Sequence, residues 1–233
     1  MTYRVGVSLR VIESATYSET RDAISHDWIR FLAGHGVVPV LIPNSLPNLR
    51  VFLEGLDVCG FLLTGGNNIG LLPDEEDLDI DDASDSRDET ELALIAFAVE
   101  QHLSVLGVCR GMQLLNVRFG GRLVRNLDEV CERRSSHVAT DHEIEIVDAN
   151  WRQRLKIKTV TTNSFHRQGV TLATLSSQLR PFAVGAKGVV EGLYHPDLPI
   201  TGIQWHPERS NSASEVDDIV LRSWLTRERI ACT

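Results

Sequence analysis

Short apolar runs recur along the chain, separated by longer segments whose apolar residues repeat with helical spacing. The runs predict strands, because a strand buried on both faces reads as a continuous apolar stretch. The longer segments predict helices. We place strands at 4–9, 37–42, 60–64, 104–108, 143–147, 158–162, 182–184, 189–194 and 199–205, and helices at 19–34, 88–102, 110–119 and 214–228.

The order of these elements predicts an α/β protein with a mostly parallel central sheet flanked by helices. Apolar strands that alternate with helices typically form such a sheet, covered on both faces. Its ligands bind beyond the carboxyl ends of the strands. Arg10, the pair Gly65-Gly66 and Cys109 each follow a predicted strand, so we expect them at one cleft. A chain of 233 residues has room for one sizeable core, and we expect one domain over 1–233.

The segment Gly107-Val108-Cys109-Arg110-Gly111 joins a predicted strand to a predicted helix. Glycines on both sides of Cys109 permit a sharp turn that lifts its side chain out of the sheet, and a larger residue at either glycine would collide with neighbouring backbone. The nearby helix N-terminus favours a thiolate. The alternative is a structural cysteine, since unpaired cysteines are often buried. The two glycines favour a nucleophile.

A candidate base lies far downstream, where His206-Pro207-Glu208 follows the last predicted strand. Proline favours extended geometry at the residue before it, so His206 and Glu208 are expected to project to the same side. A histidine that is oriented by a carboxylate through one ring nitrogen can take a proton from a thiol. By itself the pattern also fits a solvated strand end. Together with Cys109 it predicts a Cys-His-Glu catalytic triad.

Four motifs occur in one order along the chain: Phe61-Leu62-Leu63-Thr64-Gly65-Gly66-Asn67, Gly107-Val108-Cys109-Arg110-Gly111-Met112-Gln113, Asn163-Ser164-Phe165-His166-Arg167-Gln168 and Gln204-Trp205-His206-Pro207-Glu208. Arg87-Asp88 with Glu91, and Gly188-Val189-Val190-Glu191, accompany them. This set resembles the class I glutamine amidotransferase-like superfamily, in its γ-glutamyl hydrolase branch. The resemblance implies a flavodoxin-like sheet of class I glutamine amidotransferase type. It also implies that cysteine attacks a glutamyl side-chain amide, and that water hydrolyses the resulting γ-glutamyl thioester to release glutamate.

That chemistry requires N–H donors that face the oxygen on which negative charge develops. The candidates are the backbone N–H groups of Arg110 and of Gly65 or Gly66, since glycine lets the backbone approach a substrate closely. Losing one such donor typically costs roughly 3–4 kcal/mol of transition-state stabilisation. The alternative for Gly65-Gly66 is an ordinary turn at a strand end.

The resemblance also indicates side chains that contact the substrate. Gln113 resembles the residue that holds the glutamyl group, and His166 lies in the loop that covers it, although both could be structural. Arg10 points to the same cleft. The chain of residues 17–28 looks most like the γ-glutamyl-CDP-amidate hydrolases of capsular phosphoramidate synthesis; the alternative is that it forms only the first helix and its cap. In that case Arg10, Arg21, Arg87 and Arg167 are the side chains that could hold a diphosphate.

The acidity of the chain is concentrated in residues 74–91. This segment has eleven of the 32 acidic residues and one arginine, a formal charge of −10 where the whole chain has −9. The absence of a basic stripe argues against a nucleic-acid partner. We interpret the segment as a solvated loop whose last carboxylates favour the N-terminus of the next helix. A lid, or a set of ligands for Mg²⁺, is the alternative. A diphosphate near this charge would be repelled.

The remaining composition excludes several classes. No apolar stretch is long enough to span a membrane, and the start reads as a strand rather than as a signal peptide, so we expect a cytoplasmic protein. The four cysteines lack the Cys-x-x-Cys spacing of zinc or redox sites, and we expect no required cofactor. Three functions stay open: a hydrolase of a small γ-glutamyl amide, a glutaminase subunit that delivers ammonia to a separate synthetase partner, and a binding module without turnover.

Overall fold

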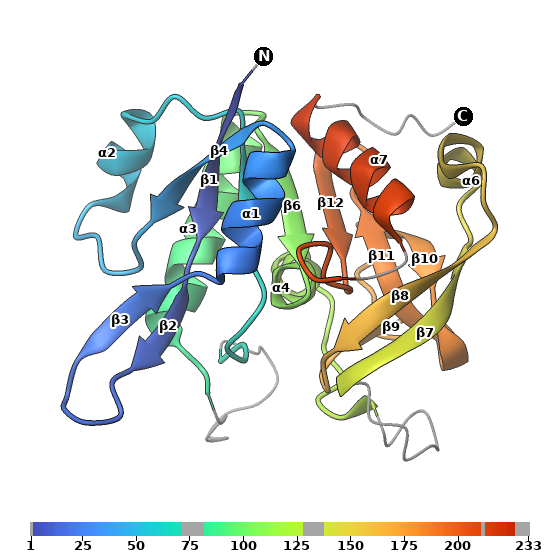
Figure 1. Ribbon diagram of the computed structural model, residues 1–233, viewed down its shortest axis with the longest axis horizontal. Coiled ribbons are helices and arrows are strands. Elements are labelled where there is room, and N and C mark those ends of the chain that lie inside the picture. Colours follow the sequence, from blue (N-terminus) through green and yellow to red (C-terminus); the bar gives the residue numbers. More distant parts are fainter. Residues whose placement is uncertain (1, 71–81, 128–137, 211–212, 227–233) are drawn as a thin grey trace.

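A twisted sheet runs through the middle of the protein, with helices on both faces (Figure 1). The computed structural model describes residues 2–70, 82–127, 138–210 and 213–226. Half of the sheet is parallel, in the order β4 (Val37–Ile42), β1 (Tyr3–Ser8), β5 (Gly60–Leu63), β6 (Ser104–Val108) and β12 (Ile200–Ile203). The predicted parallel central sheet is therefore confirmed.

The other half of the sheet is antiparallel, which the apolar runs did not indicate. Beyond β12 the order is β11 (Val189–Tyr194), β10 (Arg180–Val184), β7 (Val138–Ile146) and β8 (Thr159–Phe165), and the short β9 (Val170–Thr171) pairs with β11. The link 195–199 between β11 and β12 is too short for a crossover helix, so the two strands must run in opposite directions. A 3₁₀ turn, η1 (Ala186–Gly188), precedes β11.

Two apolar cores lie on opposite faces of the sheet. Leu62 of β5 faces the first core, whereas its neighbours Phe61 and Leu63 face the second, as the alternation of side chains along a strand requires. The first core is covered by α1 (His26–Gly34), α6 (Ala149–Leu155) and α7 (Ser214–Leu225), and the second by α2 (Leu49–Glu54), α3 (Asp85–Glu100) and α4 (Arg110–Arg118). In the described residues, no helix is long and apolar enough to cross a membrane.

The predicted helix over 19–34 is wrong in its first part. Its beginning instead forms β3 (Thr20–Ala23), which pairs with β2 (Arg10–Glu13) in a hairpin that projects from the body of the protein (Figure 1). The helix begins at His26, where the Ser25 hydroxyl accepts a hydrogen bond from the Asp27 amide. Serine is a preferred N-cap residue because it satisfies an otherwise unpaired amide of the first turn. The hairpin partner is outside the segment, so the segment's own spacing could not reveal it.

The glycines around Cys109 are required by packing between main chains. A Cβ at Gly111 would lie 2.3 Å from the carbonyl oxygen of Leu63 in β5, and a Cβ at Gly107 would lie 2.6 Å from the carbonyl carbon of Gly111. Both distances are far shorter than atomic contacts allow. The predicted collision of a larger side chain with backbone is therefore confirmed at both glycines.

This packing predicts that Gly111→Ala destabilises the protein, because α4 and β5 must move apart to admit the methyl group. We expect a loss on the order of 1–3 kcal/mol in the free energy of unfolding, measured by urea denaturation. Gly34→Ala is the matched control, since Gly34 ends α1 and a Cβ there would meet nothing within 4 Å. Equal stability of Gly111→Ala and wild type would contradict this account of the turn.

Candidate active site

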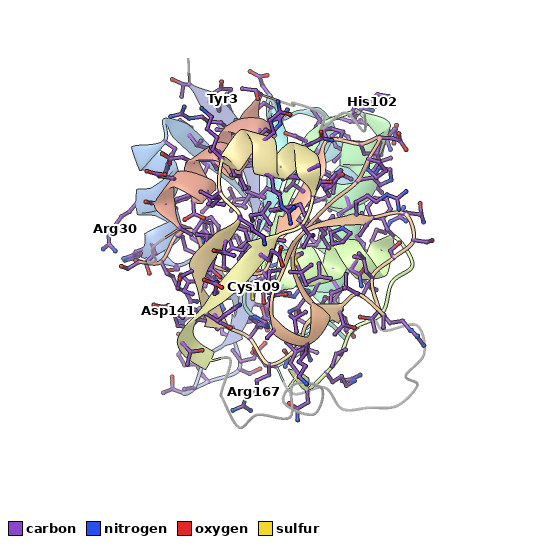
Figure 2. All side chains as sticks on the ribbon, turned by 90° about the vertical axis from the view of Figure 1, so that its right-hand side faces the viewer. Tyr3, Arg30, His102, Cys109, Asp141 and Arg167 are labelled. Carbon is purple, nitrogen blue, oxygen red and sulfur yellow. The ribbon has the colours of Figure 1, made fainter. Side chains whose placement is uncertain are left out.

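Cys109 lies between the end of β6 and the start of α4, near the middle of the molecule (Figure 2). Its backbone has φ 54° and ψ −107°, a conformation that costs energy for any residue except glycine. Its amide donates to the carbonyl of Ile203 at 2.8 Å, which ties the turn to β12. The side chain is 8% exposed and sits where the first amides of a helix have no partner within the helix.

His206 and Glu208 follow β12 and meet the cysteine from the neighbouring strand. The Nδ1 atom of His206 is 2.7 Å from Oε1 of Glu208, and both side chains are 3% exposed. Burial lowers the pKa of His206, but attraction to Cys109, a hydrogen bond with Cys109 and the Glu208 carboxylate outweigh it and raise the pKa to about 9. The structure thus brings the three predicted catalytic side chains together, with the imidazole between the thiol and the carboxylate.

The backbone of His206 is held by a residue to which the sequence assigned no role. The side-chain amide of Asn163, in β8, donates to the His206 carbonyl at 2.9 Å and accepts from the His206 amide at 2.8 Å. Asn163 is 2% exposed. The ring of Phe165 also stands perpendicular to the imidazole, with centroids 5.6 Å apart. Asn163 lies within the motif that carried the family resemblance, but its contact with His206 is a long-range tertiary contact that residue spacing does not reveal.

Gly65 and Gly66 turn away from β5 beside the same two side chains. A Cβ at Gly65 would lie 2.8 Å from the His206 ring and 3.4 Å from the Cβ of Cys109. Gly66 has φ +91°, and a Cβ there would lie 2.9 Å from the guanidinium of Arg10. A side chain at Gly65 would therefore meet the His206 ring, and the positive φ of Gly66 favours glycine there. A role of their N–H groups in an oxyanion hole stays a prediction.

Two adjoining cavities meet at Cys109. The smaller cavity, of about 260 Å³, is lined by His206 and Glu208, and the larger cavity, of about 450 Å³, by Gln113 and Arg110. Residues that line both are Arg10, Gly66, Cys109 and Phe165. The expectation that residues after three different strands meet at one cleft is confirmed.

The predicted substrate-contact residues lie at the larger cavity. Gln113 and His166, which are 4% and 5% exposed, line it, as does Arg10. Gln113 donates to the Gln168 carbonyl at 2.9 Å, and Nδ1 of His166 is 2.9 Å from the same oxygen. Both side chains thus hold the main chain of the loop at Gln168, which is the structural role that the sequence left open for them. A role in substrate binding stays a prediction.

Only part of the predicted diphosphate site is assembled. Arg10 and Arg167 line the cavities, with Arg167 at the edge of the molecule (Figure 2). Arg21 instead pairs with Glu19 at the surface, at 2.6 Å. Arg87 is completely buried and pairs with Glu91 at 3.0 Å. Neither of these two lines either cavity in the described part of the chain, so Arg21 and Arg87 were wrong candidates for holding a diphosphate.

The acidic segment divides into parts with different roles. Asp85 is the first residue of α3, as expected for a carboxylate near a helix N-terminus. Asp88 and Glu91 are fully buried, so the interpretation of residues 74–91 as a solvated loop is wrong at these two positions. Residues 74–81, on which the lid and Mg²⁺ alternatives depended, lie outside the described residues. Among those that are described, no three metal-ligating side chains cluster.

The fold is shared with solved proteins of one class. The solved glutaminase domain of Trypanosoma brucei CTPS, with bound acivicin, has a TM-score of 0.64 at 15% identity and covers 100% of this chain and 98% of that one. The fold is therefore that of the class I glutamine amidotransferases. A family model described as Peptidase C26 matches residues 5–208, and the chain belongs to this family.

Curated relatives agree with the family match. Protein NtpR of Enterococcus hirae is 31% identical over 192 residues, which are 77% of this chain and 79% of that protein. A γ-glutamyl-γ-aminobutyrate hydrolase of Escherichia coli O157:H7 is 30% identical over 208 residues, 82% and 80% of the two chains. The chain is thus a hydrolase of the C26 peptidase and glutamine amidotransferase type.

The contacts of His206 predict its titration. Removing Cys109 or Glu208 removes an influence that raises the pKa and leaves burial, which lowers it. We expect the His206 pKa to fall below about 9 in Glu208→Gln and further in Cys109→Ala, because the contributions of Cys109 are the larger. Nitrogen NMR of labelled histidine measures this directly. A His206 pKa that is unchanged in Cys109→Ala would show that the two side chains do not interact.

The Asn163 bridge predicts a matched pair of variants. Asn163→Ala should let the His206 backbone move, so the influences that raise the His206 pKa weaken and the pKa falls. Asn116→Ala is the control, because the buried Asn116 amide also braces main chain, at Arg122, Thr174 and Ser176. Both variants should lose about 1–3 kcal/mol of stability through unpaired backbone groups. The prediction fails if the His206 pKa shifts equally in both.

Proposed function

We propose that this protein hydrolyses γ-glutamyl amides through a γ-glutamyl thioester on Cys109. The observation that carries the proposal is the placement of Cys109 at a strained strand-to-helix turn, in hydrogen-bond contact with a histidine that Glu208 orients. A cysteine next to a protonated imidazole at a helix N-terminus is a nucleophile at neutral pH. The family match supports hydrolysis, and the Escherichia coli relative supports a γ-glutamyl group.

Acylation begins when Sγ of Cys109 attacks the amide carbonyl carbon. The S–C bond forms, and the electron pair of the carbonyl π bond moves onto oxygen. The negative charge on this oxygen is stabilised by hydrogen bonds from the backbone N–H groups of Arg110 and of Gly65 or Gly66. When the tetrahedral intermediate collapses, the C–N bond breaks and His206 gives its proton to the departing amine.

Deacylation reverses the role of the histidine. A water molecule takes the place of the amine, and neutral His206 removes its proton as the oxygen attacks the thioester carbonyl. The C–S bond then breaks, glutamate leaves, and the proton held by His206 again faces the thiolate. Glu208 keeps the imidazole in the orientation that both steps require.

The two cavities suggest how the substrate lies. His206 protonates the amine, so the amine occupies the smaller cavity that His206 lines, and the glutamyl group occupies the larger one beside Gln113. The larger cavity offers Arg125 and Asp82, which have charges opposite to the α-carboxylate and α-ammonium of a glutamyl group. In the smaller cavity Arg10 and Arg209 favour an amine that carries an anionic group.

Two narrower predictions from the sequence have less support. The names of the relatives given above do not support the nucleotide substrate of capsular phosphoramidate synthesis. Residues 20–23, in the segment that suggested this substrate, form β3 of the hairpin. The likeness to a glutaminase domain is at the level of fold, so delivery of ammonia to a synthetase partner is the alternative that the experiment must separate.

The test is to incubate the protein with γ-glutamyl-γ-aminobutyrate, other γ-glutamyl amides and glutamine, and to measure released glutamate and the mass of the Cys109 peptide after acid quenching. We expect a γ-glutamyl adduct on Cys109 and turnover of the γ-glutamyl amides. His206→Ala should lower turnover by about 10²–10⁴-fold, since a positioned base contributes that much. Glu208→Gln should be milder, because it orients the ring without transferring a proton.

Cys109→Ala should remove both adduct and turnover. Cys59→Ala is its control, because in the described residues Cys59 is likewise in no disulfide but lines neither cavity. Turnover that survives in Cys109→Ala would overturn the mechanism. Slow glutamine hydrolysis that a partner protein accelerates, without turnover of other γ-glutamyl amides, would favour the glutaminase alternative.

A further inference from the structure

Four charged side chains are buried beneath the turn that contains Gly65 and Gly66. Arg87, Asp88 and Glu91 come from α3 and Arg110 from the start of α4, and all are at most 2% exposed. Burying an ion costs several kcal/mol unless partners and hydrogen bonds compensate. Within the described residues, the three from α3 line neither cavity. Direct contact with a substrate therefore does not explain why these charges lie here.

Arg87 holds the main chain of the turn. Its Nη2 atom donates to the carbonyl oxygens of Thr64, at 2.7 Å, and of Gly65, at 3.1 Å. Its Nη1 atom donates to the side chain of Asn67 at 3.0 Å, one residue beyond the glycine pair. One guanidinium thus binds two successive carbonyls and the side chain that closes the turn.

Holding these carbonyls also sets the direction of the amides that follow them. Both peptide bonds are trans, and in a planar trans peptide the C=O and the next N–H point in opposite directions. The N–H groups of Gly65 and Gly66 therefore both point away from Arg87. Two successive N–H groups on one side form a concavity that binds an anion. Gly65 itself adjoins the two catalytic candidates, since a Cβ there would lie 2.8 Å from the His206 ring and 3.4 Å from the Cβ of Cys109.

The same buried charges connect the turn to the nucleophile. Nε of Arg87 donates to Glu91 at 3.0 Å, and the other oxygen of Glu91 accepts from the Arg110 side chain. Arg110 also pairs with Asp88, whose second oxygen accepts from the amide of Gly70 at 2.8 Å. Burial by itself would raise the pKa of Glu91, but the charges of Arg110 and Arg87 outweigh burial and lower it. Glu91 therefore stays ionised. Burial lowers the pKa of Arg87 to about 10, which leaves it charged at neutral pH.

We propose that Arg87 is a positioning residue for the oxyanion hole: it holds the Thr64 and Gly65 carbonyls so that the Gly65 and Gly66 amides face the reacting oxygen. Through Glu91 it is also connected to Arg110, whose backbone N–H is the other donor. Hydrogen bonding of a carbonyl to a cation further polarises the peptide and strengthens its N–H as a donor. The proposal rests on the proposed thiol chemistry but not on the identity of the substrate.

The test compares two reactions of Cys109 that differ in their need for an oxyanion hole. Acetylation by p-nitrophenyl acetate develops charge on a carbonyl oxygen, whereas alkylation by iodoacetamide displaces iodide and develops none. Arg87→Lys keeps the charge but loses the planar guanidinium that binds the two carbonyls, Asn67 and Glu91 at the same time. We expect acetylation of Cys109, followed by peptide mass, to slow by about 10²-fold, as for loss of an oxyanion-hole donor, while alkylation keeps its wild-type rate.

Arg152→Lys is the matched control, because Arg152 also donates to a main-chain carbonyl, that of Ile146, and to a carboxylate, that of Glu145. It should change neither rate. If Arg87→Lys does not fold, Glu91→Gln takes its place, because it weakens the ion pair that holds Arg87 and leaves the residues of the turn unchanged. We then expect a smaller loss of acetylation, again without a loss of alkylation.

Three results would overturn the proposal. The first is a folded Arg87→Lys, or its substitute Glu91→Gln, with the wild-type ratio of acetylation to alkylation. The second is an equal fall in both rates, which indicates a disturbed Cys109, and the third is a wild-type protein that is alkylated but not acetylated at Cys109. Failure of the proposed function is separate. p-Nitrophenyl acetate has no glutamyl group, so an absence of γ-glutamyl turnover in the wild type contradicts that function and leaves this comparison valid.

Discussion

The contact between Gly111 and the main chain of Leu63 is the constraint on which the site depends. Leu63 is the last residue of β5 before the turn that contains Gly65 and Gly66, and Gly111 is two residues beyond Cys109. At this contact α4 lies too close to β5 to leave room for a side chain. The nucleophile and the turn are therefore fixed relative to each other before any catalytic side chain is considered. The backbone angles of Cys109 are unfavourable, but they are compatible with a stable fold because the surrounding main chain is fixed. Gly107 and Gly111, two residues before and after Cys109, both pack closely against main-chain atoms.

A second constraint is the charge beneath that turn. Two arginines and two carboxylates cancel formally, but apolar side chains of similar volume often stabilise a core as well as a buried ion network does. Stability alone is thus a weak reason for the network. Its hydrogen bonds reach the main chain at Thr64, Gly65 and Gly70, which apolar side chains could not do. The network is better explained by the geometry that it imposes on the main chain than by the energy that it contributes.

The base is assembled across the boundary between the two halves of the sheet. His206 follows β12, the last strand of the parallel half, and Cys109 follows its parallel neighbour β6. Asn163 and Phe165 approach from β8, at the far edge of the antiparallel half. The parallel half thus presents nucleophile and base side by side, and the antiparallel half holds the base in place and covers the larger cavity. Burial alone would favour the neutral form of the imidazole, so its charged form depends on Cys109 and Glu208.

The sequence by itself determined the parallel strands, the turn at Cys109 and the pairing of His206 with Glu208. Each of these depends on residues that are close together in the chain, through apolar runs, flanking glycines or a two-residue spacing. Only the tertiary structure decided that Thr20–Ala23 is a strand, that Asp88 and Glu91 are buried and that Asn163 holds His206. In each of these cases the deciding partner lies outside the segment that was read: β2 for the strand, Arg110 for the carboxylates and the end of β12 for Asn163. Local patterns report how a segment fits water and its own neighbours, but a buried charge or a strand pair is stabilised by a partner that folding alone brings near.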